Sequence, residues 1–235
     1  MTIATFKDLC MDATEAPMLA GFWARTLGGH VVDRGDGSAR VDKRPGQLSN
    51  ESIWVNLVPE RRTGKSRVRL EVRLADADPA PLVAAGARVL GEPGARRWWV
   101  LADPEGNEFC ALPPDPAGGP QPGIDRLVVD SADPATQARW WAGVVGGDVE
   151  PDGYGAAAVV GAAGLPWRAL LFQPVSDPKT VKNRIHLDVD LTGPDCARLV
   201  EAGATIHRVP GGDIHWWVLT DPEGNEFCAF APDDA

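Results

Sequence analysis

The sequence lacks long apolar runs and a basic leader. No stretch approaches the roughly 18 uninterrupted apolar residues that indicate a membrane-spanning helix. Residues 1–12 show no basic segment followed by an apolar run, so no secretory signal is predicted. The four cysteines are widely spaced and form no CxxC pair, which argues against a zinc knuckle or a thioredoxin-type motif. We therefore expect a cytoplasmic protein with reduced thiols.

Basic residues are scarce as well. Lys and Arg number 23 against 33 Asp and Glu, so the formal net charge is −10 and the pI is about 4.8. This balance argues against a protein that follows nucleic-acid phosphates or an anionic membrane surface. We therefore expect neither nucleic acid nor a membrane as a partner. Tyrosine occurs once, whereas tryptophan occurs nine times, and four of the nine belong to a doublet that occurs twice.

A long segment occurs twice in the chain. Residues 98–112 read WWVLADPEGNEFCAL and residues 216–230 read WWVLTDPEGNEFCAF, which differ at only two positions. RVRLEVRL at 67–74 likewise matches RIHLDVDL at 184–191. The chain is therefore one unit of roughly 115 residues written twice, too long a period for a solenoid. We predict a first domain at residues 1–114, a Pro- and Gly-rich linker at 115–121 and a second domain at 122–235.

Each copy has a mixed α and β pattern. Helical spacing of apolar residues predicts helices near 16–28 and, after the Asp133–Pro134 start signal, from 134 onward. Short helices are predicted at 79–86 and 194–202. Alternation and turn signals predict strands at 5–12, 38–42, 52–58, 67–74, 154–160, 168–173 and 184–191, and on either side of each Pro-Glu-Gly-Asn turn.

The chain resembles the vicinal oxygen chelate superfamily. The resemblance lies in this order of elements, in the DPEGNEF hairpin and in the His186-Leu187-Asp188 strand. That group includes glyoxalases, bleomycin-resistance proteins and extradiol dioxygenases, and the chain is most similar to its glyoxalase-like branch. The resemblance implies an α+β fold of two tandem domains, each made of two βαβββ modules. The modules would form curled, mostly antiparallel sheets around a cup, with the helices outside.

The two copies of the alternating strand carry the most chemistry. His186 and Asp188 fall on the polar face of one strand, and Arg69 and Glu71 fall on the polar face of the other. A solvated face of a one-sided sheet is the simplest interpretation. The resemblance instead implies that this face lines the cup. His186 and Asp188 are then the candidate catalytic residues, because imidazole transfers protons and binds metals near neutral pH.

The resemblance also implies metal ligands on four strands, usually His or Gln, Glu, His and Glu. One copy offers Arg126, Leu171 or Gln173, His186 and Cys228 at these positions, and the other offers Asp8, Asn56, Arg69 and Cys110. Arginine cannot ligate a cation. Sharing of a site between units would gather Asp8, Asn56, His186 and Cys228, still without a glutamate. We therefore expect no metal or other cofactor, with a divalent cation as the less favoured alternative. Cys228 is either a packing residue or a pocket thiol.

Related proteins place the first residue of each tryptophan doublet in the cup, which implies that Trp98 and Trp216 contact ligand. Trp54 lies on a strand that borders the cup. The predicted ligand-binding residues are Trp98, Trp216, Arg69, Glu71, Gln173, Trp54, Arg126 and Cys228.

Three functions follow. The favoured one is binding or sequestration of a planar aromatic molecule, as in bleomycin resistance. The second is a lyase, isomerase or dioxygenase that uses His186 as a base or as a ligand of an atypical metal site. The third is a structural module with empty cups. The chain would be a monomer whose copies form a pseudo-dimer, or a homodimer.

Overall fold

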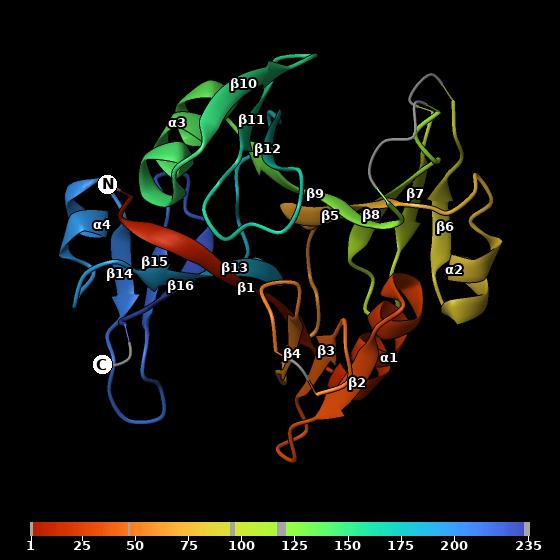
Figure 1. The fold of residues 1–235 in the computed structure, drawn as a ribbon, viewed down its shortest axis with the longest axis horizontal. Helices are drawn as coiled ribbons and strands as arrows, with labels where there is room; N and C mark the ends of the chain where they lie inside the picture. The colour runs from red at the N-terminus through yellow and green to blue at the C-terminus, as the bar shows by residue number, and fades with distance from the viewer. Residues whose placement is uncertain (1, 47, 95–96, 117–120, 233–235) are drawn as a thin grey trace.

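The computed structural model describes residues 2–46, 48–94, 97–116 and 121–232. The chain forms four consecutive modules, each a strand, a helix and three further strands (Figure 1). The first two modules contain β1 Ala4–Ala13, α1 Ala16–Leu27, β2 His30–Asp33, β3 Ala39–Asp42, β4 Ile53–Leu57, β5 Val68–Arg73, α2 Ala80–Ala85, β6 Arg88–Gly91, β7 Trp99–Ala102 and β8 Glu108–Leu112. The last two contain β9 Gly123–Ser131, α3 Pro134–Val145, β10 Asp148–Asp152, β11 Ala156–Val160, β12 Ala169–Pro174, β13 Ile185–Leu191, α4 Ala197–Glu201, β14 Thr205–Arg208, β15 Trp217–Thr220 and β16 Glu226–Phe230.

The strands form two curled, open sheets of eight strands each, and each sheet takes one module from each sequence copy. Their orders are β14-β15-β16-β13-β1-β4-β3-β2 and β10-β11-β12-β9-β5-β8-β7-β6. The copies meet where β1 pairs antiparallel with β13, and where β5 pairs antiparallel with β9. The fold is therefore α+β with mostly antiparallel sheets, as the resemblance implies. Part of the predicted linker, residues 117–120, lies outside the described residues.

Sequence signals explain where the longer helices begin and end. Asp133 caps α3, since its side chain accepts a hydrogen bond from the Thr136 backbone amide, and Pro134 occupies the first helical position. Gly28 ends α1 with a φ of 68°, a left-handed conformation that suits glycine. Helix α1 packs on β1 to β4, and α3 packs on β9 to β12, so both cover sheet faces.

A large hydrophobic core lies between helices and sheets, and a second, smaller apolar cluster contains Val128, Ala158, Ala169 and Leu171. On β13 the alternation predicted from sequence is confirmed, because Leu187, Val189 and Leu191 are buried in this core. The core crosses between the two sheets, where Phe6 of β1 meets Trp167 edge to face at 5.4 Å between ring centroids. None of the helices in the described residues is long and apolar enough to cross a membrane.

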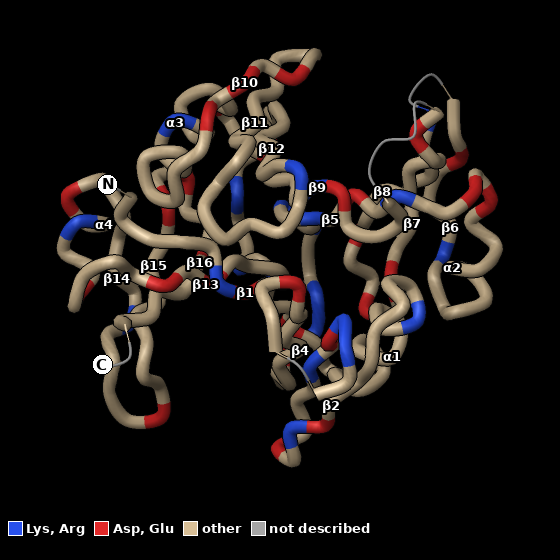
Figure 2. Tube along the Cα trace, in the orientation of Figure 1, with Lys and Arg blue, Asp and Glu red and all other residues tan. Residues whose placement is uncertain are grey.

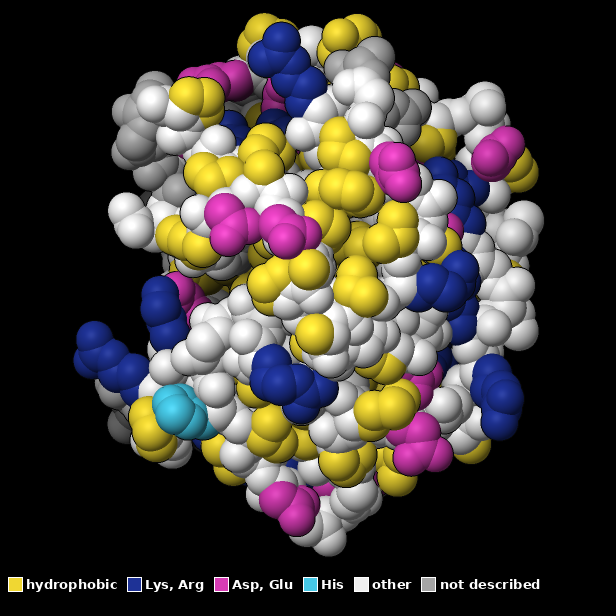
Figure 3. All heavy atoms as spheres, turned by 90° about the vertical axis from the view of Figure 1, so that its right-hand side faces the viewer, with side chains coloured by type: hydrophobic (Ala, Val, Ile, Leu, Met, Phe, Trp, Pro, Cys, Tyr) yellow, Lys and Arg dark blue, Asp and Glu magenta, His cyan; other side chains and the backbone are white. Residues whose placement is uncertain are grey.

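Residue patterns alone predicted neither β9 nor the four strands at the sheet edges. The edge strands are β2, β6, β10 and β14. Each is exposed along most of its length, so burial imposes no alternation on it. Figure 3 shows the side of the molecule that carries α2 and β6, where apolar side chains lie among charged ones. Charged residues on edge strands oppose pairing with another chain.

The DPEGN hairpins hold the modules together. Asp103 accepts hydrogen bonds from the backbone amides of Glu105 and Asn107, and its side chain thereby caps the turn. The Glu105 carboxylate extends to the preceding module and accepts hydrogen bonds from the backbone amides of Thr14 and Glu15, which tie the hairpin to the start of α1. Glu223 does the same at the start of α3, where it accepts from Ala132 and Asp133.

The buried turn aspartate predicts a specific pH dependence. Burial raises the pKa of Asp103 from 3.8 to about 6. Between these values the folded protein binds a proton that the unfolded chain has lost, so this residue favours folding below about pH 4 and progressively loses that contribution up to pH 6. We expect Asp103→Asn to gain stability relative to the parent, by about 3 kcal/mol, as the pH rises from 4 to 7. Urea denaturation across this range measures the difference. The exposed Asp36→Asn serves as the control, and a pH-independent difference for Asp103→Asn would contradict the prediction.

Candidate functional site

The first cup is the polar face of the sheet built on β1 and β13, and it is defined by Asp8, Cys10, His186, Asp188 and Cys228. Strand register places Cys10 opposite His186. Asp188 lies between Asp8 on one neighbouring strand and Cys228 on the other. Directly opposed residues have Cβ atoms about 4.5–5.5 Å apart, so the five side chains crowd together. The site exists only because the two sequence copies share this sheet.

Asp188 is the centre of the first cup. The Cys10 thiol donates a hydrogen bond to Asp188 Oδ2 at 3.2 Å, and His186 Nε2 lies 3.6 Å from Asp188 Oδ1. Both Asp188 Oδ1 and His186 Nδ1 are buried, and neither has a hydrogen-bond partner. Buried polar atoms are nearly always paired in folded proteins, so two unpaired atoms in one cluster indicate a place for a ligand.

Burial controls the ionisation of this cluster. Burial raises the pKa of Asp188, and it raises the pKa of Asp8 to about 6 against the effect of Lys7. Burial and the neighbouring Asp188 raise the pKa of the Cys10 and Cys228 thiols. Both thiols are therefore protonated at neutral pH and donate hydrogen bonds, which disfavours Cys228 as a nucleophile.

Aromatic rings border the first cup. Trp54 of β4 lies beside Cys10, with the guanidinium groups of Arg34 and Arg40 at 4.9 and 5.1 Å from its ring centroid. Trp216 stacks on Phe230 with ring centroids 5.2 Å apart. Both tryptophans are half-buried, so part of each ring is already packed against protein and part is open to solvent.

The tryptophan doublets alternate as expected. Trp99 and Trp217 pack against the hydrophobic core, and Trp99 Nε1 donates to the Ala77 carbonyl. Trp98 and Trp216 do not belong to this core and are half-buried. Trp216 lies with the first cup and Trp98 lies beside the second sheet, so they serve different sites. Ligand contact by either ring stays a prediction.

The second cup is the matching face of the other sheet, and ion pairs fill it. Arg69 donates to Asp130 and Gln173, and Arg126 donates to Glu71. Arg69, Glu71, Gln173 and Arg126 were predicted to bind ligand and Asp130 was not, yet the polar groups of all five bind one another. Figure 2 shows basic and acidic residues interleaved along β5 and β9, where these pairs lie. A ligand in this cup would have to break them.

Aligned positions explain why the cups differ. Cys10 of β1 corresponds to Val128 of β9, Asp8 corresponds to Arg126, and His186 corresponds to Arg69. The arginines neutralise the second cup, whereas the first keeps carboxyl groups, an imidazole and thiols. The predicted residues therefore divide: His186, Asp188, Cys228, Trp54 and Trp216 lie with the first cup, and Arg69, Glu71, Gln173, Arg126 and Trp98 with the second sheet.

Cys10 is the site residue that sequence reasoning missed. The β1 alternation places Cys10 on the same face as Asp8, and this signal was present in the sequence. Its partner strand lies in the other copy, so no local pattern links Cys10 to His186.

The first cup does not reproduce the ligand set that the resemblance implies. Asn56 lies opposite Asp12, farther along the sheet, and Cys228 stands in the place of a carboxylate. Among the described residues, one group could hold a metal: Cys10, His186 and Asp188, whose ligand atoms lie within 4.8 Å of one another. A thiol, an imidazole and a carboxylate suit a zinc-like cation better than one that prefers oxygen ligands.

The ion pairs of the second cup predict a stability difference. Arg126→Ala leaves Glu71 buried without its partner, so we expect a loss of about 3–5 kcal/mol in the free energy of unfolding. Arg168→Ala is the matched control, since Asp125 keeps Arg73 when Arg168 is removed. Urea denaturation compares the two variants. Equal losses in the free energy of unfolding for the two variants would show that the Arg126–Glu71 ion pair does not stabilise the second cup more than a peripheral pair does.

Comparisons with known proteins agree with this geometry. Glyoxalase I from Zea mays superimposes with a TM-score of 0.63 over 96% of this chain and 92% of its own, at 13% sequence identity. The cppA protein from Streptococcus pneumoniae superimposes with a TM-score of 0.52 over 97% of this chain and 100% of its own, at 14% identity. At these identities the likeness shows the fold alone. The curated proteins include no match to the chain. The model of the glyoxalase-like domain matches residues 8–112 and again residues 126–230, so the chain belongs to the glyoxalase-like domain family as a tandem of two such domains.

Proposed function

We propose that the chain binds a small planar molecule in the first cup, as a binding or sequestering protein that does not use the family's usual metal. The observation that carries this proposal is the pair of buried, unpartnered atoms, His186 Nδ1 and Asp188 Oδ1. A bound molecule that supplies hydrogen-bonding groups to both atoms removes the cost of leaving them unpaired, about 1–3 kcal/mol each.

The chemistry of the cup selects the kind of ligand. Asp188 and Asp8 favour a ligand that carries a cation or several hydrogen-bond donors. Trp54 and Trp216 favour a planar ring, since stacking adds about 0.5–1.5 kcal/mol per contact beyond burial. A planar aromatic amine or cation combines both features. The second cup lacks this combination because its charged groups pair internally.

Duplication supplies a matched test of the binding site. We expect 9-aminoacridine to quench tryptophan fluorescence saturably and naphthalene-2-sulfonate, a planar anion, to bind far more weakly. Trp216→Phe should weaken 9-aminoacridine binding about 2- to 10-fold through lost stacking, whereas Trp98→Phe, the same change in the other copy, should not. His186→Ala should also weaken it. Saturable quenching that is unchanged by His186→Ala, or equal effects of the two Trp variants, would place the ligand outside the first cup.

An enzyme is the second candidate, and one observation favours it. His186 Nε2 lies 3.6 Å from Asp188 Oδ1, too far for a hydrogen bond, and Nδ1 has no partner; a carboxylate beside an imidazole is a common feature of sites that use a histidine base. The reaction class is then that of a lyase, isomerase or dioxygenase. His186 acts as the base, or it binds a cation together with Cys10 and Asp188.

Metal analysis separates the two candidates. Under the binding proposal we expect protein purified without added metal to contain less than 0.1 equivalents of zinc, iron, nickel or manganese. We also expect added Co²⁺ to give no thiolate-to-cobalt absorption in the parent protein. If such absorption appears, its loss in Cys10→Ser would assign it to Cys10. Stoichiometric metal that depends on Cys10 and His186 would instead support the enzyme. A failure of every planar compound to bind, with no metal present, would leave the third alternative, a structural module.

A further inference from the structure

The two segments that cross between modules meet beside the first cup. Residues 58–67 (VPERRTGKSR) connect β4 to β5, and residues 175–184 (VSDPKTVKNR) connect β12 to β13 at the equivalent place in the second copy. Their contact is close: a side-chain carbon on Gly64 would come within 2.9 Å of Val181. The two segments are therefore closely packed at Gly64, where a larger residue would displace the Val181 side chain.

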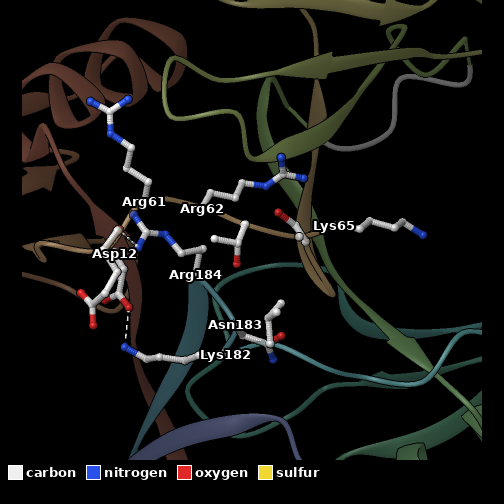
Figure 4. A pocket seen from close by; sticks show the side chains of 12 residues that line it. Asp12, Arg61, Arg62, Lys65, Lys182, Asn183 and Arg184 are labelled. Atoms are coloured by element: carbon white, nitrogen blue, oxygen red, sulfur yellow. Dashed lines mark hydrogen bonds and ion pairs between the residues drawn. The ribbon is translucent and has the colours of Figure 1, made fainter.

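A cavity of about 120 Å³ lies between these segments, and it is rich in cations for a chain of net charge −10. Of its twelve lining residues, five are Lys or Arg and two, Asp12 and Glu60, are acidic. In Figure 4, Arg184 extends from the start of β13 toward Asp12, and Lys182 pairs with Asp12. Arg61 and Lys65 extend outward, away from the centre of the view. A cavity of this volume has room for an anion of a few heavy atoms, since a single water needs only about 10–15 Å³.

Unpartnered hydrogen-bond donors concentrate on this lining. Arg62 Nε, Ser66 Oγ, Arg184 Nε and Arg184 Nη2 are buried and have no hydrogen-bond partner. Ser66 is 5% exposed, and the Arg184 side chain is 10% exposed. Since the arginine atoms can only donate and the serine hydroxyl can donate, the missing partner is a group with several acceptor atoms.

Neighbouring carboxylates position the two arginines without saturating them. Arg184 Nη2 lies 3.6 Å from Glu105, whose carboxylate already accepts hydrogen bonds from Thr14 and Glu15. Arg62 Nη2 lies 3.5 Å from Glu108. The guanidinium groups are thus held in place with N–H groups still available.

The duplicated unit provides an internal comparison. The equivalent cavity in the other half is lined by Arg67 and Lys179, the counterparts of Arg184 and Arg62. Arg67 donates to the backbone carbonyls of Asp177 and Pro178, and Lys179 donates to Glu226 at 2.7 Å. Ser66 corresponds to Asn183, which lines the same cavity as Ser66 and donates to Asn225. Arg184 Nη1 makes the matching bond to the Glu60 carbonyl at 2.7 Å, whereas its Nε and Nη2, Arg62 Nε and Ser66 Oγ have no hydrogen-bond partner. The two halves therefore share one contact and differ in the remaining donors.

We propose that the cavity lined by Arg62, Ser66 and Arg184 binds a tetrahedral oxyanion, either free phosphate or the phosphate group of a small metabolite. Guanidinium groups match such oxygens with paired N–H donors, and the serine hydroxyl adds a further hydrogen bond. The site is separate from the aromatic contacts of the first cup. Its occupation fixes the two crossover segments relative to each other, because Arg62 and Ser66 belong to one segment and Arg184 to the other.

Thermal denaturation at constant ionic strength tests the site on the whole chain. We expect inorganic phosphate to raise the Tm in a saturable way when it replaces chloride, because it binds the folded state alone. Arg62→Gln and Ser66→Ala should each weaken the apparent phosphate affinity, Arg62→Gln by at least tenfold. Arg61→Gln, the same charge change one residue earlier on an outward-pointing side chain, should leave the affinity unchanged.

Two further arms complete the experiment. If glycerol 3-phosphate binds more tightly than inorganic phosphate, the ligand is a phosphate ester; if it binds more weakly, the ligand is the free ion. Acetate should bind more weakly than either. Equal Tm shifts in phosphate and chloride, or equal losses in Arg61→Gln and Arg62→Gln, would overturn the proposal. Quenching by 9-aminoacridine in Ser66→Ala should match that of the parent, so failure of the anion site is distinguishable from failure of the cup.

Discussion

The antiparallel pairings of β1 with β13 and of β5 with β9 are the interactions on which the rest of the structure depends. Each pairing joins a strand of one sequence copy to a strand of the other, and each forms the centre of an eight-stranded sheet. Without them every module would expose a strand edge and half of a polar face. The sites therefore belong to pairs of modules, and neither sequence copy contains a complete cup.

The two cups differ in their electrostatics, because the aligned residues of the two sequence copies have diverged. In the second cup, arginines stand opposite carboxylates, and their mutual pairing offsets the cost of burying charge. In the first, burial of Asp188 beside protonated thiols leaves polar atoms without partners. The crossover segments show a related contrast: Arg67 and Arg184 both donate to backbone carbonyls, but of the two only Arg184 has buried N–H groups without partners. In each pair, one member has its buried polar groups largely paired and the other has several without partners.

Much of the site was predictable from strand alternation. The pattern around His186 and Asp188 placed both on a polar face, because one face of β13 must pack on the core. Cys10 obeyed the same rule on β1, but its proximity to His186 depends on a pairing between residues 176 positions apart in the chain. Arg62, Ser66 and Arg184 lie in or at the end of loops, where no period constrains side-chain direction, and only the packing of two segments brings them together.

The sequence by itself determined the duplication, the αβ order of each unit, the core-facing residues and the capped turns, because these follow from local periodicity and backbone preference. It did not specify the edge strands β2, β6, β10 and β14 at residue level, since exposed strands carry no burial pattern. Only the tertiary structure decided which modules share a sheet. That choice depends on long-range pairing, and it alone assigns each polar residue to a neutralised cup or to one with open hydrogen-bonding groups.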